Sequence, residues 1–161
     1  MNRFWLKSYP PGVPAQIDPQ RLRTVVQLID ESCAAHADSA AYVQMGTSIS
    51  YRQVDRLAGR FAAYLQKTTG MRKGERFAIM LPNLLQYPIA MFAALRCGLA
   101  VVNTNPLYTA PELEHQLRDS GAAAILVLEN FAHVVQNVLP HTHVRQVFVT
   151  SVGELLWFPK S

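Results

Sequence analysis

Four short apolar runs recur along the second half of the chain, and segments of helical periodicity separate them. The runs are RFAIML at 76–81, AVVNTN at 100–105, AAILVL at 123–128 and RQVFVT at 145–150. Their near-continuous apolar character is typical of strands buried on both faces of a parallel sheet. The segments between them predict helices at 89–97, 112–118 and 131–139. Spacings of about 22 to 24 residues fit minimal βαβ units, so the pattern predicts an α/β fold with a doubly wound, mainly parallel sheet and flanking helices.

The first half of the chain carries two helical patterns with a hairpin between them. Apolar residues recur every three or four positions from Arg21, which predicts a helix that ends near Ala37. Two short extended runs then flank Gly46-Thr47, where glycine at the first central position suits a tight hairpin. Ser50 and Gln53 form a capping-box pattern, which predicts a second helix that ends before Gly70.

Proline and threonine define the helix starts in the α/β half. In NPLYTAPELEHQL, Thr109 and Glu112 have the spacing of a capping box, and Pro111 falls in the first turn, where its missing N–H costs no intrahelical bond. This segment is therefore predicted to join a strand to a helix. Pro88 predicts an irregular turn at NLLQ and regular helix from about residue 88.

The chain divides into an arm and a body. Residues 1–20 are rich in proline and aromatic residues and predict an extended arm whose Phe4, Trp5 and Tyr9 dock on the body. Residues 21–161 are expected to form one α/β unit, because 161 residues that are 50% hydrophobic can bury one core.

Charge and cysteine content exclude several classes of protein. The net charge of +4 comes from fifteen Lys and Arg that form no basic run, so no nucleic-acid partner is predicted. Cys33 and Cys97 have no metal-site or disulfide spacing and are expected to be reduced, buried thiols. The N-terminus lacks a continuous apolar stretch, and no segment has the roughly 20 apolar residues of a membrane span. A cytoplasmic protein is expected, with peripheral contact to the inner membrane left open.

The carboxyl ends of the predicted strands are where ligands bind in open α/β sheets. These ends comprise residues 82–83, 103–108, 129–130 and 150–151. No GxGxxG or GxxxxGK[ST] motif follows any of them. The following polar residues are weighed as candidates and each is interpreted first as structural: Asn103, Asn105, Tyr87, Tyr108, His115, and the His141/His143 pair. The sequence assigns no catalytic, cofactor-binding or metal-binding residue.

Longer strings of residues resemble a known family. FWLKSYPPGVPAQID at the start, GERFAIMLPNLLQYPIAMFAALRCGLAVVNTNPLYTAPELEHQLRDSGAAAILVLENFAH in the centre and VFVT near the end resemble the N-terminal part of bacterial long-chain fatty acid CoA ligases, within the adenylate-forming superfamily. The resemblance implies the N-terminal subdomain of that ligase fold. It also implies a parent enzyme that uses ATP and Mg²⁺ to convert a fatty acid to an acyl-adenylate and then transfers the acyl group to CoA.

The sequence departs from the family by stopping at Ser161. The family's phosphate loop, its Tyr-Gly-x-Thr-Glu motif, its hinge Asp and its catalytic Lys have no counterpart here, so the resemblance implies a fragment that is inactive alone. Its partners would be the remaining ligase domains, with a homodimer left open. Leu155 to Phe158 are expected to form an exposed apolar tail that another surface covers. Two alternatives remain: a non-catalytic α/β interaction or dimerisation module, and a flavodoxin-like protein that binds a small molecule.

Overall fold

The computed structural model describes residues 3–20 and 24–156, and these form a mixed α/β structure with a parallel sheet. The strands are β1 (Ala40–Gln44), β2 (Thr47–Ser50), β3 (Arg76–Met80), β4 (Ala100–Asn103), β5 (Ala124–Leu128) and β6 (Gln146–Thr150). The α-helices are α1 (Val25–Ala35), α2 (Tyr51–Lys67), α3 (Gln86–Arg96), α4 (Ala110–Ser120) and α5 (Ala132–Val138). Short 3₁₀ helices are η1 (Phe4–Ser8), η2 (Glu129–Phe131), η3 (Leu139–His141) and η4 (Val152–Leu155).

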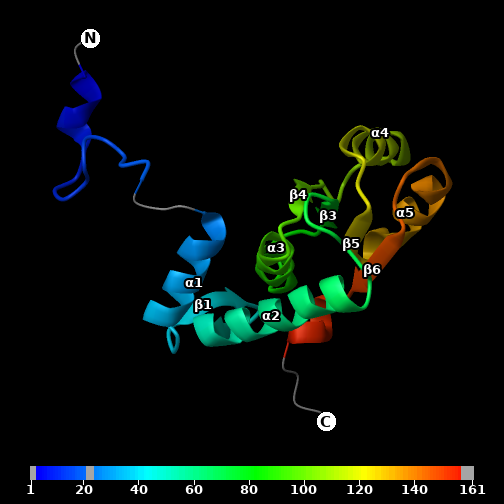
Figure 1. The fold of residues 1–161 in the computed structure, drawn as a ribbon, viewed down its shortest axis with the longest axis horizontal. Helices are drawn as coiled ribbons and strands as arrows, with labels where there is room; N and C mark the ends of the chain where they lie inside the picture. Colours follow the sequence, from blue (N-terminus) through cyan, green and yellow to red (C-terminus); the bar gives the residue numbers. More distant parts are fainter. Residues whose placement is uncertain (1–2, 21–23, 157–161) are drawn as a thin grey trace.

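The main sheet has four parallel strands in the order β4-β3-β5-β6. The chain runs from β3 outward to β4, then crosses back to place β5 on the other side of β3. Helices α2 and α3 lie on one side of the sheet and α4 and α5 on the other (Figure 1). The predicted doubly wound α/β fold is therefore confirmed, and each strand lies within the range expected from the sequence.

Alternation along the strands divides the core between the two faces. Phe77 and Ile79 of β3 pack toward α2 and α3, whereas Ala78 and Met80 pack toward α4 and α5. All four side chains are fully buried. Successive side chains of a strand point to opposite faces, so a strand covered on both sides must be apolar throughout. This is why RFAIML has no alternating polar pattern.

The strand-to-helix corner after β4 has the predicted capping box. The Thr109 N–H donates to Glu112 Oε2 at 2.8 Å, and the helix ends at Gly121 with φ of 59°. Helix α3 begins at Gln86, two residues before the predicted start, so Pro88 lies in its first turn as expected. Proline is tolerated there because its nitrogen has no intrahelical acceptor.

The hairpin differs from the prediction by one residue. Strands β1 and β2 pair antiparallel with Gln44 opposite Thr47, so the two central turn residues are Met45 and Gly46. Both have positive φ, 46° and 79°. Such a two-residue turn matches the right-handed twist of the strands, and glycine occupies its second central position rather than its first. The capping box of Ser50 and Gln53 follows at once and starts α2.

Helix α1 begins later than the sequence pattern indicated. Its N-cap is Thr24, whose side chain accepts from the Gln27 N–H at 3.0 Å, and it ends at Ala35 rather than Ala37. The earlier residues 21–23 lie outside the described part of the chain. Cys33 is the buried residue of this helix. Most other apolar side chains on its predicted apolar face are therefore partly or largely exposed to solvent.

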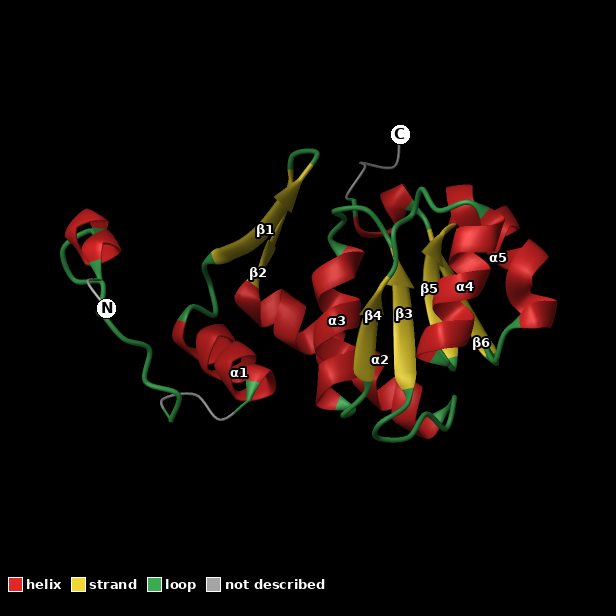
Figure 2. Ribbon diagram, turned by 90° about the horizontal axis from the view of Figure 1, so that it is seen from above, coloured by secondary structure: helices red, strands yellow, loops and turns green. Residues whose placement is uncertain are grey.

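The predictions for the two ends of the chain need correction. The arm is not wholly extended, because Phe4–Ser8 forms the 3₁₀ helix η1. Its aromatic residues do not dock on the body either: Phe4 is 72% exposed, and the arm lies apart from the sheet (Figures 1 and 2). At the other end, Leu155 and Leu156 are half-buried against a small cluster that includes Ile49 and Leu85. Trp157 and Phe158 lie outside the described residues.

Burial on both faces was predicted for all four strands, and this is wrong for the two edge strands, β4 and β6. No residue of β4 is fully buried. Val147 and Val149 are 39% and 55% exposed. In the described chain β6 is an edge strand, and α5 covers β5 but leaves the same face of β6 open.

Candidate functional site

The carboxyl edge of the main sheet is the candidate binding region. The order of strands reverses direction at β3, and the helices that follow the adjacent strands β3 and β5, α3 and α5, lie on opposite faces of the sheet. In open α/β sheets such a reversal is where ligands are expected to bind. The loop 81–85 and helix η2 form this edge. The start of α3 lies between two hollows, one on each side.

The first hollow is an apolar groove of about 440 Å³ between α2, α3 and the end of β6. We call it the β6 groove. Its apolar walls come from Leu57, Phe61, Ile89, Ala90, Leu126, Phe148, Val149 and Leu155. Its volume and lining fit the general pattern of sites that bind an apolar group and orient it with a few polar atoms.

Gln86 is the most informative polar residue of the β6 groove. It is 8% exposed, and its Nε2 donates to the Ser151 carbonyl at 2.8 Å, which ties the start of α3 to the end of β6. Its Oε1 is buried and has no hydrogen-bond partner among the described residues. A buried amide oxygen without a donor costs free energy, so this atom calls for an N–H or O–H group that the described chain does not supply.

Thr150 and Glu154 close the polar end of the groove. The Thr150 hydroxyl, which is buried, donates to the Glu154 carboxylate four residues later. This bond holds η4 against the end of β6, and places Leu155 on the groove wall.

The second hollow, of about 340 Å³, lies between the β1–β2 hairpin and the start of α3. The Leu85 N–H donates to Gln44 Oε1 at 2.9 Å, so the hairpin caps a free backbone donor at the start of α3. Beside it, the Tyr87 hydroxyl donates to Asn103 Oδ1 at 2.6 Å. The side-chain amides of Gln44 and Asn103 therefore stabilise the packing of the segments that meet at this edge.

The structure assigns structural roles to the asparagines weighed from the sequence. Asn105 Oδ1 accepts from the Leu107 N–H at 3.0 Å, which is a turn-stabilising bond two residues on. The Asn103 carbonyl accepts from Gln116 Nε2 at 3.1 Å. Tyr108 packs on the core between the sheet and α4.

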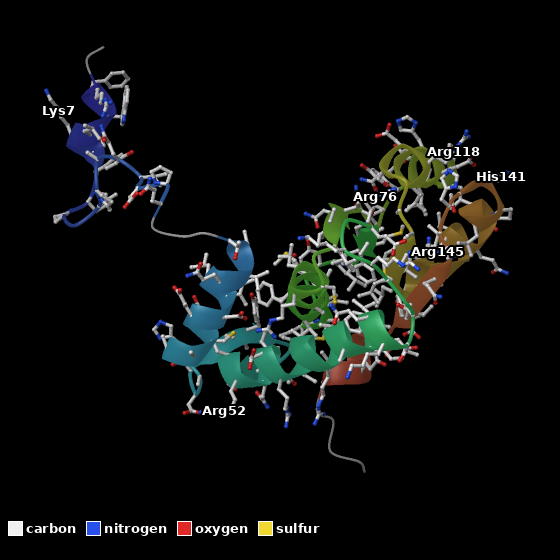
Figure 3. All side chains as sticks on the ribbon, viewed as in Figure 1. Lys7, Arg52, Arg76, Arg118, His141 and Arg145 are labelled. Carbon is white, nitrogen blue, oxygen red and sulfur yellow. The ribbon has the colours of Figure 1, made fainter. Side chains whose placement is uncertain are left out.

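Three histidines lie together on the α4–α5 side. His141 and His143 were expected to be neighbours, and the structure adds His115 of α4 to the same hollow of about 800 Å³. Figure 3 labels Arg118 and His141, which line it from α4 and from the segment after α5. Within residues 3–20 and 24–156, no group of three or more His, Cys, Asp or Glu is placed to hold a metal ion.

The two cysteines are not activated. Both are free and buried, as predicted. Burial raises the pKa of the Cys97 thiol, and it donates to the Ala62 carbonyl at 3.3 Å. Burial, reinforced by the charge of Asp55, also raises the pKa of Cys33. A raised pKa disfavours the thiolate, so neither residue is poised as a nucleophile.

The described polar side chains of the carboxyl edge hold its segments together through hydrogen bonds. Sequence reasoning pointed to this edge but overlooked Gln86. A signal was available, because a glutamine between Leu85 and Tyr87 interrupts an apolar stretch at a helix start. Its importance lies in a contact with a residue 65 positions away, which no local pattern shows.

Comparison with known proteins links the chain to one enzyme family. A family model described as AMP-binding enzyme matches residues 29–158. The chain is 49% identical over 156 residues to the long-chain-fatty-acid–CoA ligase of Salmonella typhimurium, an alignment that covers 97% of this chain and 28% of that protein. The ligase of the same description from Haemophilus influenzae is 43% identical over 160 residues, with 99% and 28% covered.

Solved structures agree with these matches. A long-chain-fatty-acid-CoA ligase from Archaeoglobus fulgidus superposes with a TM-score of 0.76 at 26% identity, over 91% of this chain and 32% of that one. A benzoate CoA ligase from Burkholderia xenovorans gives a TM-score of 0.74 at 25% identity, over 80% and 26% of the two chains. The chain thus spans about 28% of the length of the curated relatives it matches.

Proposed function

The chain belongs to the AMP-binding enzyme family, and from this premise we propose that it is part of a long-chain fatty acid CoA ligase. In the proposed reaction, a fatty acid carboxylate attacks the α-phosphate of ATP and releases pyrophosphate. The CoA thiol then displaces AMP from the acyl-adenylate to give the acyl-CoA thioester. Adenylation supplies the leaving group that a carboxylate lacks.

One observation carries the proposal. Identity of 49% extends over 97% of the chain, so the resemblance to the Salmonella ligase is not confined to a short motif. It includes the loops of the carboxyl edge as well as the buried strands. The fold of the Archaeoglobus ligase adds an independent structural match.

The described residues do not fit ATP or Mg²⁺ by themselves. The connections after the four parallel strands, residues 81–85, 104–109, 129–131 and 151–156, contain no Lys or Arg to balance a triphosphate. The described residues also offer no metal-binding cluster. We therefore assign no catalytic, cofactor or metal residue to this chain and propose that ATP, Mg²⁺ and CoA bind to other parts of the parent enzyme. Residues 21–161 would form part of its N-terminal subdomain, with residues 1–20 as an arm.

The test is an activity assay on two forms of the protein. The purified 161-residue chain is incubated with ATP, Mg²⁺, palmitate and CoA, beside the complete polypeptide that its gene encodes. The expected result is palmitoyl-CoA from the complete polypeptide and none above background from the chain. Thioester formed by the chain alone would show that it carries catalytic groups, and an inactive complete polypeptide would overturn the proposed function.

The second candidate is a non-catalytic α/β interaction or dimerisation module. One edge of β6 has no partner among the described strands, and this favours the module, because a free strand edge can pair with another protein. The encoded sequence separates the two: a phosphate loop downstream of residue 161 supports the ligase, and a stop codon there supports the module. Analytical ultracentrifugation of the chain would reveal a dimer.

For localisation, we propose a cytoplasmic ligase that touches the inner membrane peripherally through its arm. No helix in the described ranges is long and apolar enough to cross a membrane. Phe4 and Trp5 are exposed beside Lys7, a combination that suits the interface of an anionic bilayer. Co-sedimentation with vesicles of phosphatidylglycerol tests this, and a protein lacking residues 1–20 should sediment less. Equal sedimentation of the two forms would remove the arm from the proposal.

A further inference from the structure

Helix α2 presents a row of basic side chains to solvent. The exposed residues Arg52, Arg56, Arg60 and Lys67 follow one another at intervals of four, four and seven positions. At about 100° per residue, they fall within roughly 80° of the helix circumference. We call these four residues the α2 basic face. They form no basic run along the sequence, so only the helix brings them together.

The α2 basic face lies opposite the side of the helix that packs on the core, and Figure 3 shows its member Arg52 on the side away from the sheet. The acidic residue of α2, Asp55, binds Arg96 of α3 instead. Arg52 forms an exposed ion pair with Asp38. The other three members of the face form no ion pair within residues 3–20 and 24–156. Three of the four positive charges are therefore free to attract an anion.

Most of the net charge of the chain is concentrated on this helix. With four basic residues and one acidic residue, α2 carries a formal charge of +3, and the whole chain carries +4. Helix α4, by contrast, mixes Arg118 with Glu112, Glu114 and Asp119. The α2 basic face therefore produces a positive field along a helix about 25 Å long.

The composition of this face distinguishes between two classes of anionic partner. Protein interfaces usually have a centre of aromatic or large aliphatic side chains. The α2 basic face has none within it, and the ring of Tyr64 lies only at its border. An anionic bilayer needs no such centre, because its charge is spread over a surface. Each Lys or Arg close to that surface strengthens binding by about fivefold.

We propose that the α2 basic face is a docking surface for an anionic phospholipid bilayer, with the helix lying parallel to the membrane plane. It adds a second, electrostatic contact to the one proposed for the arm, and two weak attachments bind a membrane more firmly than one. The inference rests on the proposed localisation in taking the inner membrane as this bilayer. It requires neither the arm nor acyl-CoA formation.

Vesicle co-sedimentation of the complete polypeptide that the gene encodes tests this surface. Arg56→Glu reverses a charge within the α2 basic face. Arg118→Glu is the matched control: it changes the net charge equally at a side chain that is 64% exposed, on the opposite side of the sheet. Arg56→Lys keeps the charge. Each protein retains the arm and is mixed with vesicles of phosphatidylcholine, with or without phosphatidylglycerol, and thermal melting checks that it is folded.

Arg56→Glu is expected to bind the phosphatidylglycerol vesicles on the order of 20-fold more weakly than wild type, since two unit charges of attraction are lost. Arg118→Glu should stay within about twofold of wild type, and Arg56→Lys should bind like wild type. Binding should also weaken as salt is raised.

Equal losses for the two glutamate variants would overturn the proposal, because net charge alone would then explain them. Equal binding of wild type to both kinds of vesicle would overturn it as well. Unchanged vesicle binding by Arg56→Glu would reject the bilayer and leave the face to an acidic protein. Acyl-CoA formation without vesicles, expected to be the same for wild type and Arg56→Glu, reports on the proposed function separately.

Discussion

Among single residues, Gly121 shows most clearly why one residue type is required. It ends α4 with φ of 59°, a left-handed conformation that glycine adopts without strain. Arg76 reaches over it from β3: Nη2 donates to the Gly121 carbonyl at 2.7 Å, and Nε donates to the Ser120 carbonyl at 2.8 Å. The guanidinium thereby satisfies carbonyls at the negative end of the helix dipole.

The substitution Gly121→Ala is expected to destabilise the protein by about 1–3 kcal/mol. The added Cβ would lie 2.5 Å from Arg76 Nη2, so it forces the guanidinium away in addition to straining the backbone. Gly74→Ala is the matched control, because Gly74 also has positive φ but a Cβ there meets nothing within 4 Å. Urea unfolding monitored by circular dichroism should give the larger loss for Gly121→Ala, and equal losses would contradict the role of Arg76.

Between elements, Arg96 joins three helices. From α3 its guanidinium binds Asp30 of α1 at 2.6 Å and Asp55 of α2 at 2.5 Å, and it also donates to the Asp55 carbonyl at 3.0 Å. Burial alone would lower its pKa, but the hydrogen bonds to Asp30 and Asp55 outweigh burial and raise it. Since α1 buries only Cys33, this cluster holds much of the helix in place.

The substitution Arg96→Ala should cost about 1–2 kcal/mol and release α1 before the sheet unfolds. Limited proteolysis should then cut near α1 while the body stays intact. Arg52→Ala, which removes an ion pair whose side chains are 65% and 85% exposed, should change stability by no more than about 0.5 kcal/mol. Similar proteolysis of both variants would show that Arg96 does not hold α1.

Glu75 precedes β3 and binds Arg145, which precedes β6. This contact predicts that the stability of the fold depends on pH. The Arg145 side chain donates to Glu75 at 2.7 Å, and this bond together with the Arg72 N–H lowers the pKa of Glu75 below its usual 4.5. A lowered folded-state pKa stabilises the fold above the unfolded-state value, and the stabilisation is lost as pH falls through the folded-state pKa.

Glu75→Gln should therefore lower the stability of the fold near neutral pH. It should also reduce the loss of stability that the wild type shows as the pH falls from about 5 to about 3. Urea midpoints measured across that range check the expectation. Glu114→Gln, which breaks the 3.4 Å pair with Arg118 on the surface of α4, is the control and should keep the wild-type slope. Parallel curves for wild type and Glu75→Gln would refute the link.

Across the whole molecule, an aromatic cluster connects α2 to the sheet. Phe61 contacts Phe77 of β3 and Phe148 of β6 with ring centroids 6.2 and 5.7 Å apart. Phe77 is fully buried at the centre of the larger core. The cluster spans strands that are not adjacent in the sheet.

Phe77→Ala is expected to cost about 3–5 kcal/mol, because it leaves a cavity that surrounding helices cannot close. That is a large part of the roughly 5–15 kcal/mol that stabilises a typical domain. Phe4→Ala in the arm, where the ring is 72% exposed, should have almost no effect on the thermal midpoint. Calorimetry of the two variants compares them, and a small loss for Phe77→Ala would mean that the cluster tolerates a void.

Local chemistry explains which features were predictable from the sequence. The capping boxes at Ser50 and Thr109 and the four parallel strands depend on residues close together in the chain, so their patterns predicted them. The hairpin was misplaced by one residue because Met45 adopts positive φ, which side chains rarely do. The arm was wrongly predicted to dock because aromatic content does not say where a partner surface lies.

The sequence by itself determined the helices and strands of the α/β half, the α/β class and the family, since these follow from periodicity, caps and shared residues. Only the tertiary structure decided that β6 lies at an edge, that Gln86 meets Ser151 and that Arg96 gathers three helices. Such contacts join residues up to 66 positions apart. They depend on how the strands are ordered in the sheet, which local patterns along a single chain do not encode.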